Sequence, residues 1–134
     1  MVPAFNDWAK PTETEMKYLL LIYVDEAQGR AIAANKEDAD KMLPAYTAYT
    51  GALQQAGALV GGARLKFSDT ATTVRIADGK TKVLNGPYAE AKEQLGGYFM
   101  IDVPDLDSAL SWAARCPGAS HGVVEVRPIW PMTQ

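Results

Sequence analysis

The apolar residues of this chain recur with two periods, one typical of strands and one typical of helices. Residues 17–24 (KYLLLIYV) are apolar almost without interruption, which predicts a strand buried on both faces. Residues 96–103 (GGYFMIDV) and 122–129 (GVVEVRPI) instead alternate between two faces. This alternation predicts two further strands.

Two segments show the spacing of an amphipathic helix. Between residues 37 and 56 apolar side chains recur every three or four positions, and Gly57 stands where a C-terminal cap belongs. Because Pro44 lies inside this stretch, we expect the helix to begin near Leu43, with the proline in its first turn. Asp105 is placed to cap the second helix. The apolar stripe of this second helix comprises Leu106, Ala109, Leu110 and Ala113.

The remaining segments are shorter and punctuated by glycine. Residues 58–65 (ALVGGARL) predict a strand in which the glycine pair marks a bulge or a close backbone approach. Residues 70–76 and 81–84 predict a hairpin closed by a tight Asp-Gly turn at 78–79. Residues 25–34 show no clear period, and we expect them to connect the first strand to the first helix.

The order strand, helix, strands, strand, helix, strand predicts an α+β fold. With right-handed crossovers it becomes a ferredoxin-like split βαβ, an antiparallel sheet with two helices on one face. The first strand is apolar on both sides, with Leu19, Leu21 and Tyr23 on one and Leu20 and Ile22 on the other. We therefore expect a partner on the uncovered face, most simply a second copy, and an interface that also holds a pocket.

Composition and charge bound the class of protein. With 134 residues, 48% apolar and 22% charged, the chain fits one globular domain, which we place at residues 16–130. Residues 1–15 form an expected flexible tail and residues 131–134 a short C-terminal one. Thirteen basic against sixteen acidic side chains give a net charge of −3, which does not favour nucleic-acid binding.

The same sequence features bear on location and on metals. No apolar run is long enough to span a membrane, and no export signal is recognisable. The single cysteine, Cys116, suits a reducing cytoplasm and is expected to be a small core residue, because the end of a helix disfavours a thiolate. No paired His or Cys spacing typical of a metal site occurs, so we predict no metal and no cofactor.

Two residues are candidates for acid–base catalysis. His121 is the only histidine, and Asp25 leaves the first strand at its end. Either could serve as a base in a proton transfer. The alternative for His121 is a histidine at a strand edge without a chemical role.

A larger set of aromatic and polar residues is a candidate ligand pocket, because aromatic walls with a few convergent polar groups are typical of small-molecule sites. Tyrosines on the helical stripe could equally belong to the core, and the segment 85–88 could be a structural turn. The glutamate and arginine on the last strand could pair with each other or across a dimer. The candidate pocket residues are Tyr23, Tyr46, Tyr49, Arg64, Arg75, Asn85, Tyr88, Tyr98, Glu125 and Arg127.

Several stretches together resemble the DGPF branch of the YCII-related proteins. They are KYLLLIYVDE (17–26), LQQAGALVGGARL (53–65), TATTVRIADGK (70–80), NGPYAEAKEQLGGYFMIDVPDLDSAL (85–110) and VEVRPI (124–129). The name-giving Asp-Gly-Pro-Phe is present as Asn85-Gly86-Pro87-Tyr88. The resemblance implies a ferredoxin-like, dimeric α+β barrel.

The wider YCII-related group is associated with a His–Asp pair, which this chain lacks. When the chain is aligned with this group on the basis of the resemblance, Tyr46 falls at the histidine position and Cys116 at the aspartate position. A tyrosine with an ordinary pKa near 10 is a poor base at neutral pH. The pair's mechanism therefore does not carry over.

Three functions remain open at this point. The first is a cytoplasmic homodimer that binds a small organic molecule. The second is a small, cofactor-independent enzyme of proton-transfer type. The third, which rests on relatives encoded with or fused to alternative sigma factors, is an accessory protein of sigma-factor regulation.

Overall fold

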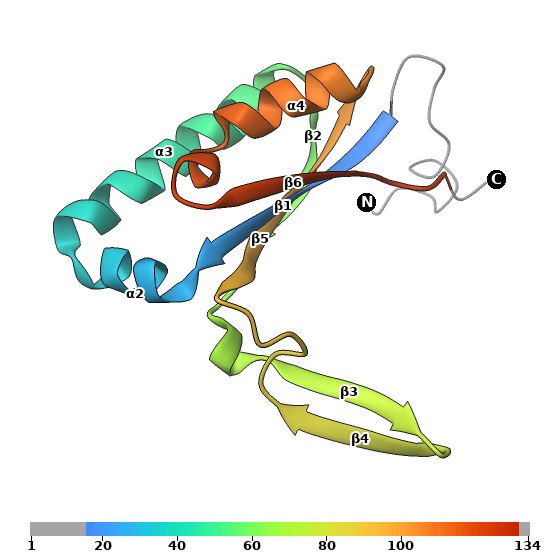
Figure 1. The fold of residues 1–134 in the computed structure, drawn as a ribbon. Helices are drawn as coiled ribbons and strands as arrows, with labels where there is room; N and C mark the ends of the chain where they lie inside the picture. Colours follow the sequence, from blue (N-terminus) through green and yellow to red (C-terminus); the bar gives the residue numbers. More distant parts are fainter. Residues whose placement is uncertain (1–15, 132–134) are drawn as a thin grey trace.

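A computed structural model describes residues 16–131 and shows one antiparallel sheet of four strands in the order β2-β5-β1-β6 (Figure 1). This confirms the predicted ferredoxin-like α+β fold. The predicted tail at residues 1–15 lies outside the described residues. The strands are β1 (Met16–Asp25), β2 (Leu59–Arg64), β5 (Glu93–Val103) and β6 (Val123–Pro128).

Two helices, α3 (Lys36–Gln55) and α4 (Leu106–Arg115), cover one face of the sheet (Figure 1). As predicted, Gly57 follows α3 with a positive φ of 71°, and the carboxylate of Asp105 caps α4 by accepting from the backbone N–H of Ser108. The 3₁₀ turn Pro117–Ser120 joins α4 to β6.

The expected start of the first long helix, near Leu43, is wrong. Helix α3 begins at Lys36, because the side chain of Asn35 accepts a hydrogen bond from the backbone N–H of Asp38 at 3.2 Å and so caps the helix there. Pro44 stands inside the helix. The exposed helix accommodates the loss of one backbone hydrogen bond.

Residues 25–34, expected to be a connection, form a further helix, α2 (Glu26–Ala34). None of its residues is buried. A helix without a buried face imposes no apolar period on its sequence, which explains why the pattern did not reveal it.

The core lies between the sheet and the helices α3 and α4. Leu20, Leu53 and Ile101 are its fully enclosed large side chains. Helix α4 contributes the small residues Ala109 and Ala113, which are buried, whereas two leucines of the predicted stripe are not. Leu106 is 48% exposed and Leu110 47% exposed, so the prediction for this stripe holds only in part.

Within residues 16–131, no helix covers the opposite face of the sheet, and we call it the open face. Strand pairing sets Leu19 opposite Met100 and Leu21 opposite Tyr98, while the alternate residues of β1 point into the core. The open face consists of Lys17, Leu19, Leu21 and Tyr23 of β1, Tyr98, Met100 and Asp102 of β5, and Val123, Glu125 and Arg127 of β6.

The glycine pair of β2 behaves as predicted. The register of β2 against β5 shifts between Leu59 and Gly61, which is the expected bulge. At Gly62, an added Cβ would lie 2.7 Å from the carbonyl oxygen of Tyr98. The close backbone approach therefore requires glycine at that position.

The predicted hairpin forms a separate two-stranded sheet, β3 (Thr72–Ala77) with β4 (Lys80–Asn85). Asp78 and Gly79 both have positive φ, 52° and 73°, as a tight two-residue turn requires. Figure 1 shows the hairpin extending from the end of the sheet, away from α3 and α4.

Candidate functional site

Asp25, the first acid–base candidate, caps α2. Its Oδ1 accepts hydrogen bonds from the backbone N–H of Ala27 at 3.0 Å and of Gln28 at 3.3 Å, and its Oδ2 lies 3.5 Å from Nζ of Lys92. The Gln28 hydrogen bond, with smaller contributions from Ala27 and Lys92, lowers the pKa of Asp25. A carboxylate held in its charged form in this way is a weaker base than an ordinary one.

His121, the second candidate, is exposed at the end of the 3₁₀ turn before β6. Its element lies at the same end of the sheet as Asp25, because Tyr23 pairs with Val123. Among the ion pairs of residues 16–131, none includes His121. Proton transfer by these two residues therefore stays a prediction.

Two predicted pocket tyrosines, Tyr46 and Tyr49, lie in the helix layer. The hydroxyl of Tyr49 donates to the backbone oxygen of Trp112 at 2.6 Å. The ring of Tyr49 packs edge-on against Phe99, with the two ring centres 5.3 Å apart. Tyr46 stacks on the same phenylalanine, with the two ring centres 6.5 Å apart. Both tyrosines thus join α3 to the sheet, and Tyr49 also joins it to α4.

Tyr46 and Cys116, which the resemblance aligns with the His–Asp pair, both border Gly118. An added Cβ on Gly118 would lie 2.8 Å from Tyr46 Oη and 3.9 Å from Cys116 Sγ. Burial, helped by the adjacent Cys116, raises the pKa of Tyr46 to about 12. Burial also raises the pKa of Cys116. At neutral pH both groups keep their protons, so this pair offers no base.

Cys116 is 2% exposed. This confirms the expectation of a small core residue rather than an accessible thiol.

Three predicted pocket residues belong to the hairpin and the turn after it. Arg75 lies with its guanidinium 5.6 Å from the ring centre of Tyr88, in cation–π range. Tyr88 is 76% exposed, and Asn85 is exposed at the end of β4. Arg64 is exposed at the end of β2, near enough to lower the pKa of Tyr46 slightly.

The open face holds the other four pocket candidates: Tyr23, Tyr98, Glu125 and Arg127. Arg127 donates a hydrogen bond to Glu125 within the same chain. The sheet separates these residues from Tyr46 and Tyr49. The structure therefore divides the predicted pocket between the open face, the helix layer and the hairpin.

The open face also carries a polar pair that sequence reasoning missed. Nζ of Lys17 lies 3.4 Å from Oδ2 of Asp102, and both side chains are largely covered. The other carboxylate oxygen, Oδ1, is buried and has no hydrogen-bond partner among the described residues. Alternation places each residue on one face of its own strand, but only the strand register shows that these two faces coincide and that Lys17 is opposite Asp102.

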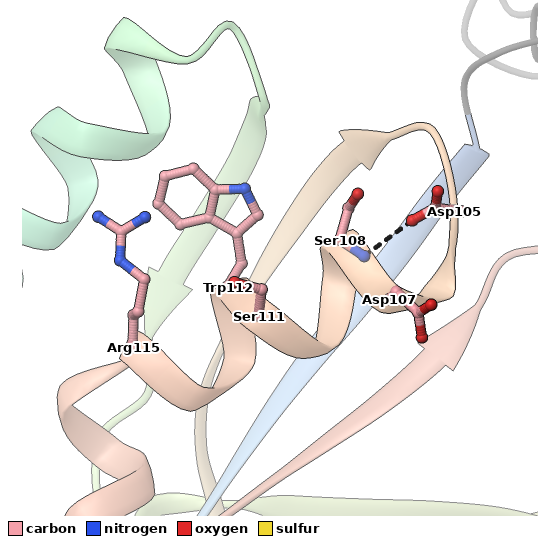
Figure 2. Close-up of a pocket in the computed structure, with 6 residues that line it drawn as sticks. All are labelled: Asp105, Asp107, Ser108, Ser111, Trp112 and Arg115. Carbon is pink, nitrogen blue, oxygen red and sulfur yellow. Dashed lines mark hydrogen bonds between the residues drawn. The ribbon is translucent and has the colours of Figure 1, made fainter.

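A shallow groove of about 440 Å³ runs along α4, and none of the predicted pocket residues lines it. Two of its polar groups are engaged locally (Figure 2): Asp105 accepts from the backbone N–H of Ser108, and the guanidinium of Arg115 lies 4.2 Å from the ring centre of Trp112. The lining residues are Asp105, Asp107, Ser108, Ser111, Trp112 and Arg115. We assign this groove no ligand.

Within residues 16–131, no three His, Cys, Asp or Glu side chains gather as a metal site would require. The helices of that part of the chain are all too short or too polar to cross a membrane.

The sheet has one helix-covered face, one open face and an inserted hairpin. These features place the protein in the class of small ferredoxin-like α+β domains. The family model of the YCII-related domain matches residues 16–133, and the chain belongs to this family. It is 39% identical over 116 residues to an uncharacterised protein of Rhizobium meliloti (strain 1021), a match covering 85% of this chain and 92% of that protein. This confirms the resemblance to the YCII-related proteins, while the assignment to the DGPF branch stays a prediction.

Proposed function

We propose that the protein is a homodimer that binds a small organic molecule at its open face. The observation that carries this proposal is the apolar centre of that face, where Leu19 and Leu21 pair with Met100 and Tyr98. A contiguous apolar surface on a folded domain is typical of an interaction site. The helices that shield the other face leave this one without cover in residues 16–131.

A second copy is the occupant that the charges favour. The open face carries two cations and two carboxylates, and they form the pairs Lys17–Asp102 and Arg127–Glu125 within one chain. Because these charges balance, two open faces can meet about a two-fold axis without like-charge repulsion. The dimeric barrel implied by the family resemblance supports the same arrangement.

The chemistry of the ligand follows from the polar atoms that the face leaves without partners. Oδ1 of Asp102 is buried without a donor among the described residues, and a buried acceptor without a partner is costly. Tyr98 belongs to the apolar centre of the same face, and Tyr23 follows that centre along β1. These features support a small, largely apolar molecule that bears a hydroxyl or amino group.

The dimer is tested by Leu21→Lys, with Leu43→Lys as its matched control. Leu43 is 74% exposed on α3, so the same change there leaves the open face intact. We expect wild type and Leu43→Lys to sediment as dimers and Leu21→Lys as a folded monomer, because a buried lysine without a partner opposes association. A monomeric wild type at micromolar concentration would refute the dimer.

Ligand binding is tested by thermal unfolding with benzyl alcohol, benzylamine and toluene as probes. We expect the two probes with a donor group to raise the midpoint by a few degrees more than toluene, since a ligand stabilises the state it binds. Asp102→Ala should remove this difference, whereas Asp107→Ala, a change at an exposed carboxylate of α4, should preserve it. Equal midpoints for all three probes in the wild type would contradict the proposed ligand class.

A further inference from the structure

The hairpin of residues 72–85, which we call the arm, presents two unlike faces. Val74 pairs with Val83 and Arg75 pairs with Lys82, so alternate residues of the two strands share a face. One face is uncharged and consists of Thr72, Val74, Ile76, Thr81, Val83 and Asn85. The other face is basic and consists of Thr73, Arg75, Ala77, Lys80, Lys82 and Leu84.

The uncharged face has no cover in residues 16–131. Val74 is 61% exposed, Ile76 73% and Val83 59%. Within the described residues, β3 and β4 contact mainly each other. A two-stranded hairpin alone in water is marginally stable and usually needs a surface to pack against. The β-branched side chains of this face are therefore suited to burial against another surface.

The base of the arm is anchored, so the arm leaves the body in a defined direction. On one side, Glu26 accepts a hydrogen bond from the backbone N–H of Ser68 at 2.7 Å, and Arg30 lies 3.0 Å from Asp69. On the other side, Lys92 pairs with Asp25. Both ends of the arm thus join the junction of β1 and α2, as expected of a docking element and not of a loose loop.

The direction of the arm leads away from its own helix layer. Figure 1 shows β3 and β4 extending from the end of the sheet, on the side away from α3 and α4. The open face lies on this side of the sheet. A second copy seated on the open face would therefore lie within reach of the arm.

Charge selects the body of a second copy as the surface that the arm meets. Three of the chain's 13 basic side chains but only one of its 16 acidic side chains lie in the arm. The arm is therefore positive and the rest of the chain negative. Contact between two arms would bring like charges together, whereas contact between an arm and a body brings opposite charges together.

We propose that the arm of each subunit packs its uncharged face on the body of a second copy, so that the two subunits hold each other reciprocally. This inference rests on the proposed homodimer and adds to it a second contact, outside the open face. The basic face then lies on the side of the arm away from the contact, where its charge attracts the acidic body only at longer range, and it disfavours pairing of free arm edges.

The first experiment compares apolar residues on the two opposite faces of the arm. Val83→Thr combined with Val74→Thr removes apolar surface from the uncharged face but keeps β-branched side chains. Leu84→Thr makes a similar loss on the basic face, where Leu84 is 68% exposed. We expect the double variant to raise the dimer dissociation constant about tenfold or more, and Leu84→Thr to leave it within about twofold.

The second experiment locates the contact directly. A photo-crosslinking amino acid at Val83 in the full chain, mixed with isotope-labelled subunits, should crosslink to the body of the second copy, residues 16–65 or 93–128. The same group at Leu84 should do so far less. Crosslinks from Val83 to its own chain, to residues 1–15 or to another arm would overturn the proposal.

The two proposals fail in different ways. If Leu21→Lys dissociates the dimer while the Val74→Thr/Val83→Thr variant associates like the wild type, the arm proposal is refuted and the homodimer stands. A monomeric wild type refutes both. Circular dichroism of each variant confirms that a change in association is not a loss of fold.

Discussion

Replacing Gly122 with alanine should destabilise the protein by about 3 kcal/mol. Gly122 lies just before β6, where that strand joins β1. An added Cβ would stand 2.2 Å from the carbonyl oxygen of Tyr23 and 3.5 Å from Cα of Val24. Both neighbours are backbone atoms of the central strand, so neither can turn aside as a side chain could. The start of β6 must then separate from β1.

Gly51→Ala is the matched control, because it makes the same change inside α3. A Cβ there meets nothing within 4 Å, and alanine is the better helix former by about 1 kcal/mol. In urea, the free energy of unfolding should therefore be higher than that of the wild type for Gly51→Ala and lower for Gly122→Ala. A Gly122→Ala protein as stable as the wild type would contradict the close packing of β6 against β1.

The fold was predictable because its signals are local. Alternation placed Phe99, Ile101 and Val103 on the face that proves to be covered by helices, and the Asp-Gly turn at 78–79 located the hairpin. The helix α2 was not predictable from its apolar pattern, since it buries no side chain. The start of α3 was misplaced because Pro44 suggested a break, while the side chain of Asn35 caps the helix earlier.

The candidate site was predictable only in part, because its residues are assembled by strand register. The sequence placed Tyr23 on the same face of its strand as Leu19 and Leu21, and the structure shows that this face belongs to the open face, together with Tyr98. It also grouped them with Tyr46 and Tyr49, which the sheet keeps on the other side. Periodicity shows which residues share an element's face, but not which faces of different elements meet.

Asp25 shows the same limit at a single residue. At the end of a strand, Asp25 could act as a catalytic base or cap a helix, and the sequence did not reveal the helix that it caps. In the structure its carboxylate binds the first backbone N–H groups of α2 and the ammonium of Lys92. Its described contacts are those of a residue that fixes the base of the arm.

Raising the pH above about 9 should destabilise the protein steeply, because the buried Tyr49 and Cys116 and the half-buried Tyr46 resist ionisation. Burial raises the pKa of Tyr46 to about 12 and also raises the pKa of Tyr49 and of Cys116. In the unfolded chain these groups ionise near their ordinary pKa values, 10.0 for tyrosine and 9.0 for cysteine. The folded protein then retains protons that the unfolded chain loses. Its stability is therefore fully present below pH 9 and falls as the pH rises toward 12.

The free energy of unfolding in urea, measured from pH 8 to pH 11.5, tests this dependence. The double variant Tyr46→Phe/Tyr49→Phe should be less stable at pH 8, since Tyr49 loses its hydrogen bond to Trp112, but its stability should fall less steeply with pH. Tyr88→Phe, at a tyrosine that is 76% exposed, should follow the wild-type slope. Parallel slopes for the wild type and the double variant would show that these two tyrosines ionise as readily in the folded protein as in the unfolded chain.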